Sequence, residues 1–457
     1  IEARGFTTAL DDRGDWQPAQ GQATLANQRS DRPGEQLAVC GGCHARRQEI
    51  GRPEVGGEFL DAYTPSLLLE GLYFADGQIE DEVYVYGSFL QSKMHAAGVV
   101  CSNCHQPHTL QLRAEGNALC AQCHDATVFD ATEHHHHPAG SEGAQCVECH
   151  MPTRTYMVVD PRRDHSFRVP QPIHSDLLGT PNACTGCHED KNNAWAKKAL
   201  QQWYGAQPLR DEHAPTLAIA RGNNPAALNP LLALAADDNA APIIRATALQ
   251  ESGRFPSQQT ATAIVEQLYA DEPLMRVGAV RALEFMSPQQ RYGVMHLLVD
   301  DPVKSVRMAV AAALAGVDPA DLGDERGNAL RTLFTEYEAA MAMNADMPSA
   351  QLNLGVYYAN RGQWEQAEAA YQQALKLSPA FVPALLNLAD LYRAGDKDNW
   401  AMPMLEQAIR LQPAEAPAYH ALGLLQVRQQ RLDEALAALA KAAELAPGNA
   451  RYAYVYG

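Results

Sequence analysis

The cysteines constrain this chain more than any other feature, because all ten lie between residues 40 and 187 and form pairs with the spacing CxxC. In every pair, the residue after the second Cys is His. The five motifs, numbered here in chain order, are Cys40/Cys43/His44, Cys101/Cys104/His105, Cys120/Cys123/His124, Cys146/Cys149/His150 and Cys184/Cys187/His188. With 16 His in 457 residues, five such coincidences by chance have a probability on the order of 5 × 10⁻⁸. The CxxCH unit is therefore a functional repeat around which the chain must fold.

The chemistry of CxxCH distinguishes it from other uses of paired cysteines. An even number of Cys fits a disulfide framework, and CxxC fits tetrahedral zinc, but zinc uses two pairs at a time and five pairs leave one over. In CxxCH the two thiols form thioethers to the haem vinyl groups, and the adjacent His is the proximal iron ligand. The sequence therefore predicts five haem c groups. Because covalent haem attachment takes place outside the cytoplasm, it also predicts an exported protein, periplasmic or extracellular.

The sixth ligand of each iron separates an electron carrier from an enzyme, since a distal His closes the iron and an open position permits catalysis. Eight further His lie among the motifs: His95, His108, His134, His135, His136, His137, His165 and His174. We expect five of these as distal ligands: His95, His108, His165 and two members of the run from His134 to His137.

Within that run, alternate side chains of an extended chain share a face, so His135 and His137 are the expected ligands. A solvated or zinc-binding His cluster is the alternative, and His174 is a weaker candidate ligand. Three arginines around His165 are expected to neutralise haem propionates. They are Arg162, Arg163 and Arg168.

The spacing of the motifs limits how the haems are housed. Motifs 2 to 5 begin at residues 101, 120, 146 and 184, and the gaps of 19, 26 and 38 residues are too short for separate domains. We therefore expect stacked rings as the core, wrapped by loops. Motif 1 begins 61 residues before motif 2 and is expected at one end of the array, apart from the compact group of four. Haem 1 and a haem at the far end would then be where electrons enter and leave.

Helical repeats fill the rest of the chain. A 31-residue period aligns Arg245, Arg276 and Arg307, each preceded by a Pro, and resembles HEAT-like repeats. A 34-residue period then matches the tetratricopeptide repeat. It aligns Pro379, Pro413 and Pro447, and also Gly355, Ala389 and Gly423, whose small side chains suit a tight helix contact. The predicted fold class is mainly α, with a loop-rich multihaem domain followed by an α-solenoid.

Three domains are expected from these patterns: a pentahaem c-type cytochrome domain over 1–205, HEAT-like repeats over 206–325 and tetratricopeptide repeats over 326–457. Residues 449–457 resemble the opening helix of a further repeat without a polar cap, so we expect the chain to continue beyond Gly457. The groove of a solenoid favours a partner-binding or self-associating surface over a passive scaffold.

Charge and hydropathy exclude some functions. The chain has 36 Lys and Arg against 54 Asp and Glu, a net charge of −18, which disfavours nucleic acid as a partner. No run of about 18 apolar residues occurs, so no transmembrane segment is expected. The start at Ile1, without a charged and then apolar leader, is typical of a mature N-terminus.

Several segments between residues 39 and 200 resemble exported multihaem (pentahaem) c-type cytochromes that carry tetratricopeptide repeats. They are CGGCHARR, SFLQSKMHAAGVVCSNCHQPH, GNALCAQCH, HHHHPAGSEGAQCVECHMP, YMVVDPRRDHSFRVP and LGTPNACTGCH. The haem part is more distantly similar to pentahaem nitrite reductase and octahaem hydroxylamine oxidoreductase. The resemblance implies a loop-rich haem domain with close ring pairs. That nitrite reductase holds its substrate haem through the Lys of CxxCK, whereas all five motifs here end in His, so no catalytic residue carries over.

The leading hypothesis is electron transfer through five haems outside the cytoplasm. The acceptor would be another redox protein, an extracellular electron acceptor or the next subunit of a homopolymer joined end to end as a filament. One alternative is a multihaem oxidoreductase acting on a small nitrogen or sulfur oxyanion. Another is a repeat-based assembly factor whose haems are secondary. An electron carrier is favoured over an enzyme.

Overall fold

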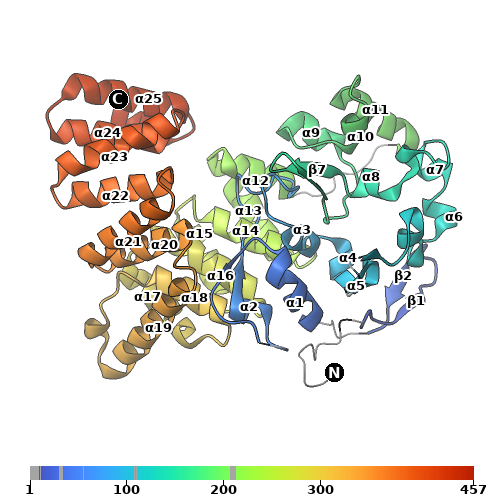
Figure 1. The fold of residues 1–457 in the computed structure, drawn as a ribbon, viewed down its shortest axis with the longest axis horizontal. Helices are drawn as coiled ribbons and strands as arrows, with labels where there is room; N and C mark the ends of the chain where they lie inside the picture. Colours follow the sequence, from blue (N-terminus) through green and yellow to red (C-terminus); the bar gives the residue numbers. More distant parts are fainter. Residues whose placement is uncertain are drawn as a thin grey trace. The chain divides into compact units, whose positions relative to one another are not determined.

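The computed structural model describes residues 10, 12–29, 34–54, 56–107, 109, 111–205 and 213–457. His108, an expected distal ligand, lies outside the described residues. The chain is mainly helical, and its few strands form two-stranded ribbons, so the predicted fold class is confirmed (Figure 1). It divides into two compact units. Unit 1 comprises Ile1–Gln48, Arg52–Arg221 and Pro225–Ala282, and unit 2 comprises Glu49–Gly51, Gly222–Asn224 and Leu283–Gly457.

Each CxxCH motif of unit 1 lies on or beside a short helical turn. Motifs 1, 2, 4 and 5 lie on α1 (Gly34–His44), α5 (Cys101–Cys104), α8 (Cys146–His150) and α10 (Ala183–Cys187), and motif 3 lies at the end of the 3-10 helix η1 (Gly116–Gln122). Residues three apart on such a turn share a face, so the two Cys of a motif project together. Side-chain caps fix where two of these turns begin, because Asn117 accepts from the Cys146 backbone N–H and Asn182 from that of Cys184, both at 2.9 Å.

Short elements and loops connect the motifs, as expected for a loop-rich domain. The ribbons pair β1 (Trp16–Pro18) with β2 (Leu25–Asn27), β3 (Arg47–Glu49) with β4 (Tyr63–Pro65), β5 (His105–Gln106) with β6 (Gln111–Leu112), and β7 (Thr153–Tyr156) with β8 (Asp160–Arg163). The helices are α2 (Phe59–Ala62), α3 (Tyr86–Leu90), α4 (Lys93–Ala96), α6 (Ala126–Phe129), α7 (Thr132–His135), η2 (Glu142–Ala144), α9 (Pro172–Leu178) and α11 (Asn193–Tyr204).

The first repeat helices pack on the motif segment and belong to unit 1. They are α12 (His213–Arg221), η3 (Pro225–Ala227), α13 (Leu228–Ala236), α14 (Pro242–Ser252), α15 (Gln258–Gln267) and α16 (Pro273–Ala282). The Leu68 N–H donates to Thr247 Oγ1 at 3.1 Å, and Arg221 donates to the carbonyls of Leu68 and Tyr73 at 2.7 and 2.9 Å. Unit 1 therefore extends to Ala282, because these helices pack on the motif segment.

The 31-residue period has a structural basis in its arginines. Arg245 Nε donates to the Ala235 carbonyl at 3.0 Å, and Arg276 donates to the Ala270 carbonyl at 2.8 Å. In unit 2, Arg307 donates in the same way to the Asp301 carbonyl at 2.7 Å. Each arginine thus reaches back to carbonyls near the end of the preceding helix, which would otherwise lack partners.

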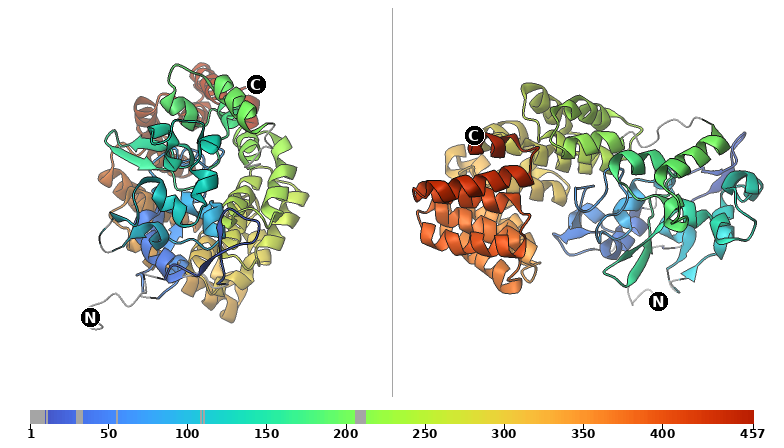
Figure 2. Two further views of the ribbon diagram at one scale, coloured as in Figure 1. Left: turned by 90° about the vertical axis from the view of Figure 1, so that its right-hand side faces the viewer. Right: turned by 90° about the horizontal axis from the view of Figure 1, so that it is seen from above.

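Unit 2 is a stack of helix pairs (Figures 1 and 2). It begins with η4 (Leu283–Phe285), α17 (Pro288–Met295), η5 (His296–Asp300), α18 (Lys304–Ala313), η6 (Pro319–Leu322) and α19 (Asp324–Ala342). Three tetratricopeptide pairs follow, α20 (Pro348–Asn360) with α21 (Trp364–Leu377), α22 (Val382–Ala394) with α23 (Asp398–Leu411), and α24 (Ala416–Arg428) with α25 (Leu432–Leu445), and then α26 (Ala450–Tyr456). A Cβ added at Gly355 would collide with the Tyr371 ring, and one at Gly423 would lie 2.6 Å from Leu439. The small residues of the 34-residue period therefore lie at close helix contacts.

Within the described part of the chain, no helix is both long enough and apolar enough to cross a membrane.

Candidate haem-binding site

Neighbouring motifs approach one another through their cysteines. The Cys40 thiol of motif 1 is close enough to the Cys101 thiol of motif 2 for the two to shift each other's pKa, which is lowered for Cys40 and raised for Cys101. Cys120 of motif 3 stands in the same relation to Cys146 of motif 4. Motif 1 is therefore adjacent to motif 2, although 61 residues separate them and the sequence analysis set motif 1 apart.

The remaining neighbours are joined by thiols that perturb one another. Burial raises the pKa of the Cys104 thiol to about 11, and the nearby Cys123 of motif 3 adds to this shift. Burial likewise raises the pKa of Cys184 of motif 5 to about 11, with a contribution from Cys149 of motif 4. Each motif is therefore a neighbour of the next one along the chain, and we call this arrangement of motifs 1 to 5 in chain order the row.

Three of the motif histidines lie about 6 Å from a second histidine, with their ring planes 12° to 29° apart. The centroids of His105 and His165 are 6.3 Å apart with 21° between the ring planes. The other two pairs are His134 with His150, at 6.2 Å and 12°, and His137 with His188, at 6.0 Å and 29°. Each pair joins the His of one CxxCH motif to a His from elsewhere in the chain.

This spacing fits iron held between two imidazoles. Metal–nitrogen bonds of about 2.0 Å on both sides, plus roughly 1.1 Å from each nitrogen to its ring centroid, place the two centroids about 6.2 Å apart. Direct aromatic stacking would bring two rings closer, as in the 4.3 Å stack of His136 on Trp203. The three pairs therefore have the separation of axial ligands.

In each pair, one histidine has its Nδ1 next to a backbone carbonyl. His150 Nδ1 lies 2.7 Å from the Arg168 carbonyl, and His165 Nδ1 lies 2.9 Å from the Arg163 carbonyl. His137 Nδ1 is likewise 2.5 Å from the His135 carbonyl. An Nδ1–H that donates to a carbonyl leaves Nε2 unprotonated, which is the tautomer that a metal ligand requires.

Burial also favours neutral imidazoles at the row. It lowers the pKa of His105, with help from His165 and His44. Burial is again the main cause of the lowered pKa of His124, His134 and His165. Neutral rings can donate a lone pair to iron. The lowered pKa values and the Nδ1–carbonyl contacts therefore both favour the form of His that can bind a metal.

The run of four His does not follow the extended alternation that the sequence analysis assumed. His134 and His135 end helix α7, and His136 adopts the left-handed conformation with φ 57°. This turn places His134 opposite His150 and His137 opposite His188, so His134 occupies the place expected for His135. His135 Nδ1 instead accepts the backbone N–H of His137 at 3.2 Å.

Two aromatic residues at the end of α11 hold this turn. The His136 ring stacks on Trp203, and Tyr204 meets it edge-on at 5.6 Å. The Tyr204 hydroxyl also donates to the His134 carbonyl. Trp203 and Tyr204 lie beyond the last motif, and no sequence pattern pointed to their contact with the four histidines.

The other candidate histidines are placed differently. His95 in α4 meets Phe89 edge-on at 5.4 Å, and its backbone N–H is capped by Ser92. His174 is only 2% exposed, and neither ring nitrogen has a hydrogen-bond partner among the described residues. His174 also lines a small cavity together with Cys149 of motif 4 and Arg168.

The arginines expected at propionates already have protein partners. Arg162 forms ion pairs with Glu82 and Asp160, and Arg163 with Glu148 at 2.6 Å. Arg168 donates to Gln91 Oε1 at 2.9 Å. The contacts that the structure shows for these three arginines are thus with protein side chains, and their expected role at haem propionates stays a prediction.

The comparisons with known proteins agree with the two kinds of repeat. The doubled CXXCH motif family matches residues 94–129, which include His95 and motifs 2 and 3. Tetratricopeptide repeat families match residues 348–381 and 416–449. The chain therefore combines tetratricopeptide repeats with a paired motif for covalent c-type haem. No curated protein matches it.

Among solved structures, the crystal structure of MamA protein is 18% identical over 43% of this chain and 97% of its own, with a TM-score of 0.27. A thermophilic tetratricopeptide repeat protein of Thermus thermophilus is 22% identical over 44% of this chain and 97% of its own, also with a TM-score of 0.27. Similarity at this level carries no argument about function.

Proposed function

We propose that this chain binds five haems through its five CxxCH motifs and carries electrons along the row that they form. The observation that carries the proposal is the set of three parallel His pairs with the spacing of axial ligands. In this proposal His165, His134 and His137 are the distal ligands of motifs 2, 4 and 5. His95 and His108 serve motifs 1 and 3, and His135 is not a ligand.

The histidines beside each motif determine whether the bound haems would carry electrons or also bind a substrate. Bound haem iron alternates between Fe(III) and Fe(II) and so accepts or gives one electron. The His on the distal side of each pair occupies the position that a small substrate would need, which favours a carrier over an enzyme. Backbone carbonyls of Arg163, Arg168 and His135 hold the ligands in one tautomer and orientation.

The ends of the row are the proposed contact points for redox partners. Cys43 and His44 of motif 1 and Cys187 of motif 5 are exposed. Electrons would enter at one end and leave at the other, outside the cytoplasm, where covalent haem attachment takes place. The tetratricopeptide repeats supply a surface for protein partners or for further copies of the chain, which would join rows into an extended conduit.

Intact mass spectrometry of the mature protein tests the haem count. We expect five haem additions per chain, and four after Cys120 and Cys123 of motif 3 are both replaced by Ala. A stoichiometry of four or six in the unaltered protein would contradict the proposal, as would an unchanged mass increment in the double variant.

A further inference from the structure

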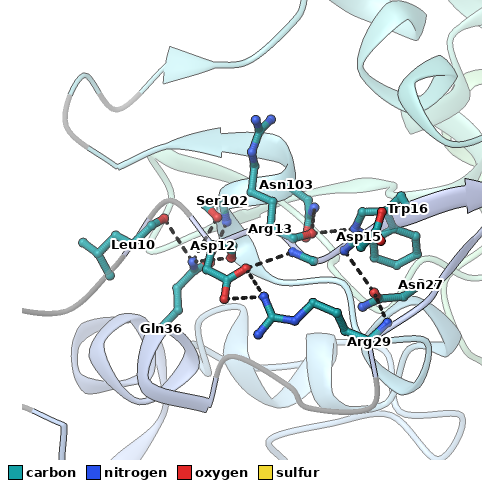
Figure 3. Close-up of polar contacts among 11 residues, drawn as sticks. Leu10, Asp12, Arg13, Asp15, Trp16, Asn27, Arg29, Gln36, Ser102 and Asn103 are labelled. Atoms are coloured by element: carbon teal, nitrogen blue, oxygen red, sulfur yellow. Dashed lines mark hydrogen bonds and ion pairs between the residues drawn. The ribbon is translucent and has the colours of Figure 1, made fainter.

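A buried pair of polar side chains joins the helices that carry motifs 1 and 2. Gln36 lies on α1, four residues before Cys40, and Ser102 is the first spacer residue of motif 2. Gln36 Nε2 donates to Ser102 Oγ at 2.9 Å, and the Ser102 backbone N–H donates to Gln36 Oε1 at 2.9 Å (Figure 3). Gln36 is 1% and Ser102 0% exposed, so water does not compete for these bonds.

The segment before α1 closes over this junction. Gln36 Nε2 also lies 3.0 Å from the Leu10 carbonyl, and Asn103, the second spacer residue of motif 2, donates to the Arg13 carbonyl at 2.9 Å. An ion pair joins the two ends of this segment, because Arg29 Nη1 donates to both carboxylate oxygens of Asp12, at 2.6 and 2.7 Å (Figure 3).

The same segment reaches motif 3. The Leu25 N–H on β2 donates to the Cys123 carbonyl at 2.9 Å, and the Asp125 N–H donates to the Ala23 carbonyl at 2.8 Å. Residues 12–29 therefore contact motif 2 through its spacer and motif 3 through its backbone. No other spacer has two hydroxyl or amide side chains. The other spacers are Gly41 and Gly42, Ala121 and Gln122, Val147 and Glu148, and Thr185 and Gly186.

We propose that Gln36 is a positioning residue that fixes motif 1 against motif 2 and thereby sets the relative geometry of haems 1 and 2. The inference rests on the proposed function, because it concerns the first step along the row. The role is specific, since the two hydrogen bonds run between motifs and not within one. A shift of α1 against α5 would leave both buried partners unsatisfied, so one arrangement is strongly preferred.

The test compares holoprotein variants by electron paramagnetic resonance and by potentiometric titration of the haems. Gln36→Leu removes both bonds between the motifs together with the contact to the Leu10 carbonyl, and Ser102→Ala removes only the bond to the Ser102 hydroxyl. Gln122→Leu is the matched control, because Gln122 is an exposed spacer residue whose amide donates to the Leu119 carbonyl within its own turn and to no other described residue. The haem 2 signal is identified beforehand as the one that disappears from the low-spin spectrum in His165→Ala.

We expect Gln36→Leu to keep its haem count but to shift the signals and potentials of haems 1 and 2 alone. Ser102→Ala should shift the same two haems by less, and Gln122→Leu should shift none. Spectra unchanged in both Gln36→Leu and Ser102→Ala would overturn the positioning role, and so would an equal shift of all five haems, which indicates general destabilisation. If Gln36→Leu fails to accumulate, Ser102→Ala decides between these outcomes. A haem count other than five in the unaltered protein would instead contradict the proposed function.

Discussion

The His134 ring lies opposite the His150 ring at a centroid distance of 6.2 Å, with only 12° between their planes. His150 is the proximal His of motif 4, and its Nδ1 is anchored on the Arg168 carbonyl. His134 lies near the end of helix α7 and not in an extended segment. The four histidines therefore divide into two kinds: His134 and His137 lie next to motif histidines, whereas His135 accepts a backbone N–H.

That division can be tested by single substitutions. We expect His134→Ala to convert one haem from low spin to high spin, because its iron loses the distal nitrogen. His135→Ala is the matched control and should leave every haem low spin. Electron paramagnetic resonance of the oxidised proteins gives the answer, and a high-spin signal in His135→Ala alone would reverse the assignment.

His165 and His174 form a second contrast. His165→Ala should make haem 2 high spin, whereas His174→Leu should leave the spin states unchanged. Since a buried polar group without a partner costs about 1–3 kcal/mol, His174→Leu should also maintain or raise the unfolding temperature. A new high-spin signal in His174→Leu would show that His174 does reach an iron.

The ion pair between Arg307 and Glu336 contributes to the stability of unit 2. Arg307 Nη2 and Nε contact the two Glu336 oxygens at 2.6 and 2.9 Å. We expect Arg307→Ala to lower the free energy of unfolding by about 2 kcal/mol, because it removes a bidentate, charge-assisted contact. The exposed Arg331→Ala should change it by less than about 0.5 kcal/mol. Equal losses in the two variants, measured by denaturant titration, would refute a special role for the pair.

The same pair predicts a pH dependence. Its bonds to Arg307 lower the pKa of Glu336 in the folded state. A depressed carboxyl pKa contributes stability above the unfolded value, about 4.3 for Glu, and that contribution is lost as the pH falls through the folded value. The difference in unfolding free energy between the unaltered protein and Glu336→Gln should therefore shrink below about pH 4.3. A difference that stays constant down to pH 3 would argue against the pair.

Assembly can be followed as a function of salt. The net charge of −18 opposes association of copies, and screening weakens that repulsion. If rows join through motifs 1 and 5, longer particles should form as the ionic strength rises. Electron microscopy of the purified protein at low and high salt would show this, and particles that stay monomeric at high concentration would leave a soluble shuttle as the function.

Periodic features were the ones that sequence alone could predict. The CxxCH spacing and the 34-residue period depend on local chemistry, so motifs and repeat helices lie where they were expected. The row order could not be predicted, because the approach of Cys40 to Cys101 spans 61 residues of irregular chain. His134 was not chosen over His135 because the extended alternation assumed for the run is interrupted by a single left-handed residue, His136, after the end of helix α7.

The extent of unit 1 and the Gln36 junction likewise depend on contacts between residues far apart in the sequence, which local patterns do not predict. Composition changes at residue 205, yet Thr247 and Arg221 bond to the segment around Leu68, which no local pattern reveals. Two sequence features are consistent with the Gln36 junction. Gln36 precedes Cys40 by one helical turn, and the spacer of motif 2 is the only one with two hydroxyl or amide side chains, Ser102 and Asn103.

The central claim is a row of five haems, each closed by two His ligands. Electron paramagnetic resonance of the fully oxidised holoprotein, with spin quantitation against the protein concentration, tests it most directly. We predict low-spin ferric signals that integrate to five per chain, with no high-spin component. A stoichiometric high-spin signal would contradict the account, because it would show an iron with an open position and point to an oxidoreductase instead.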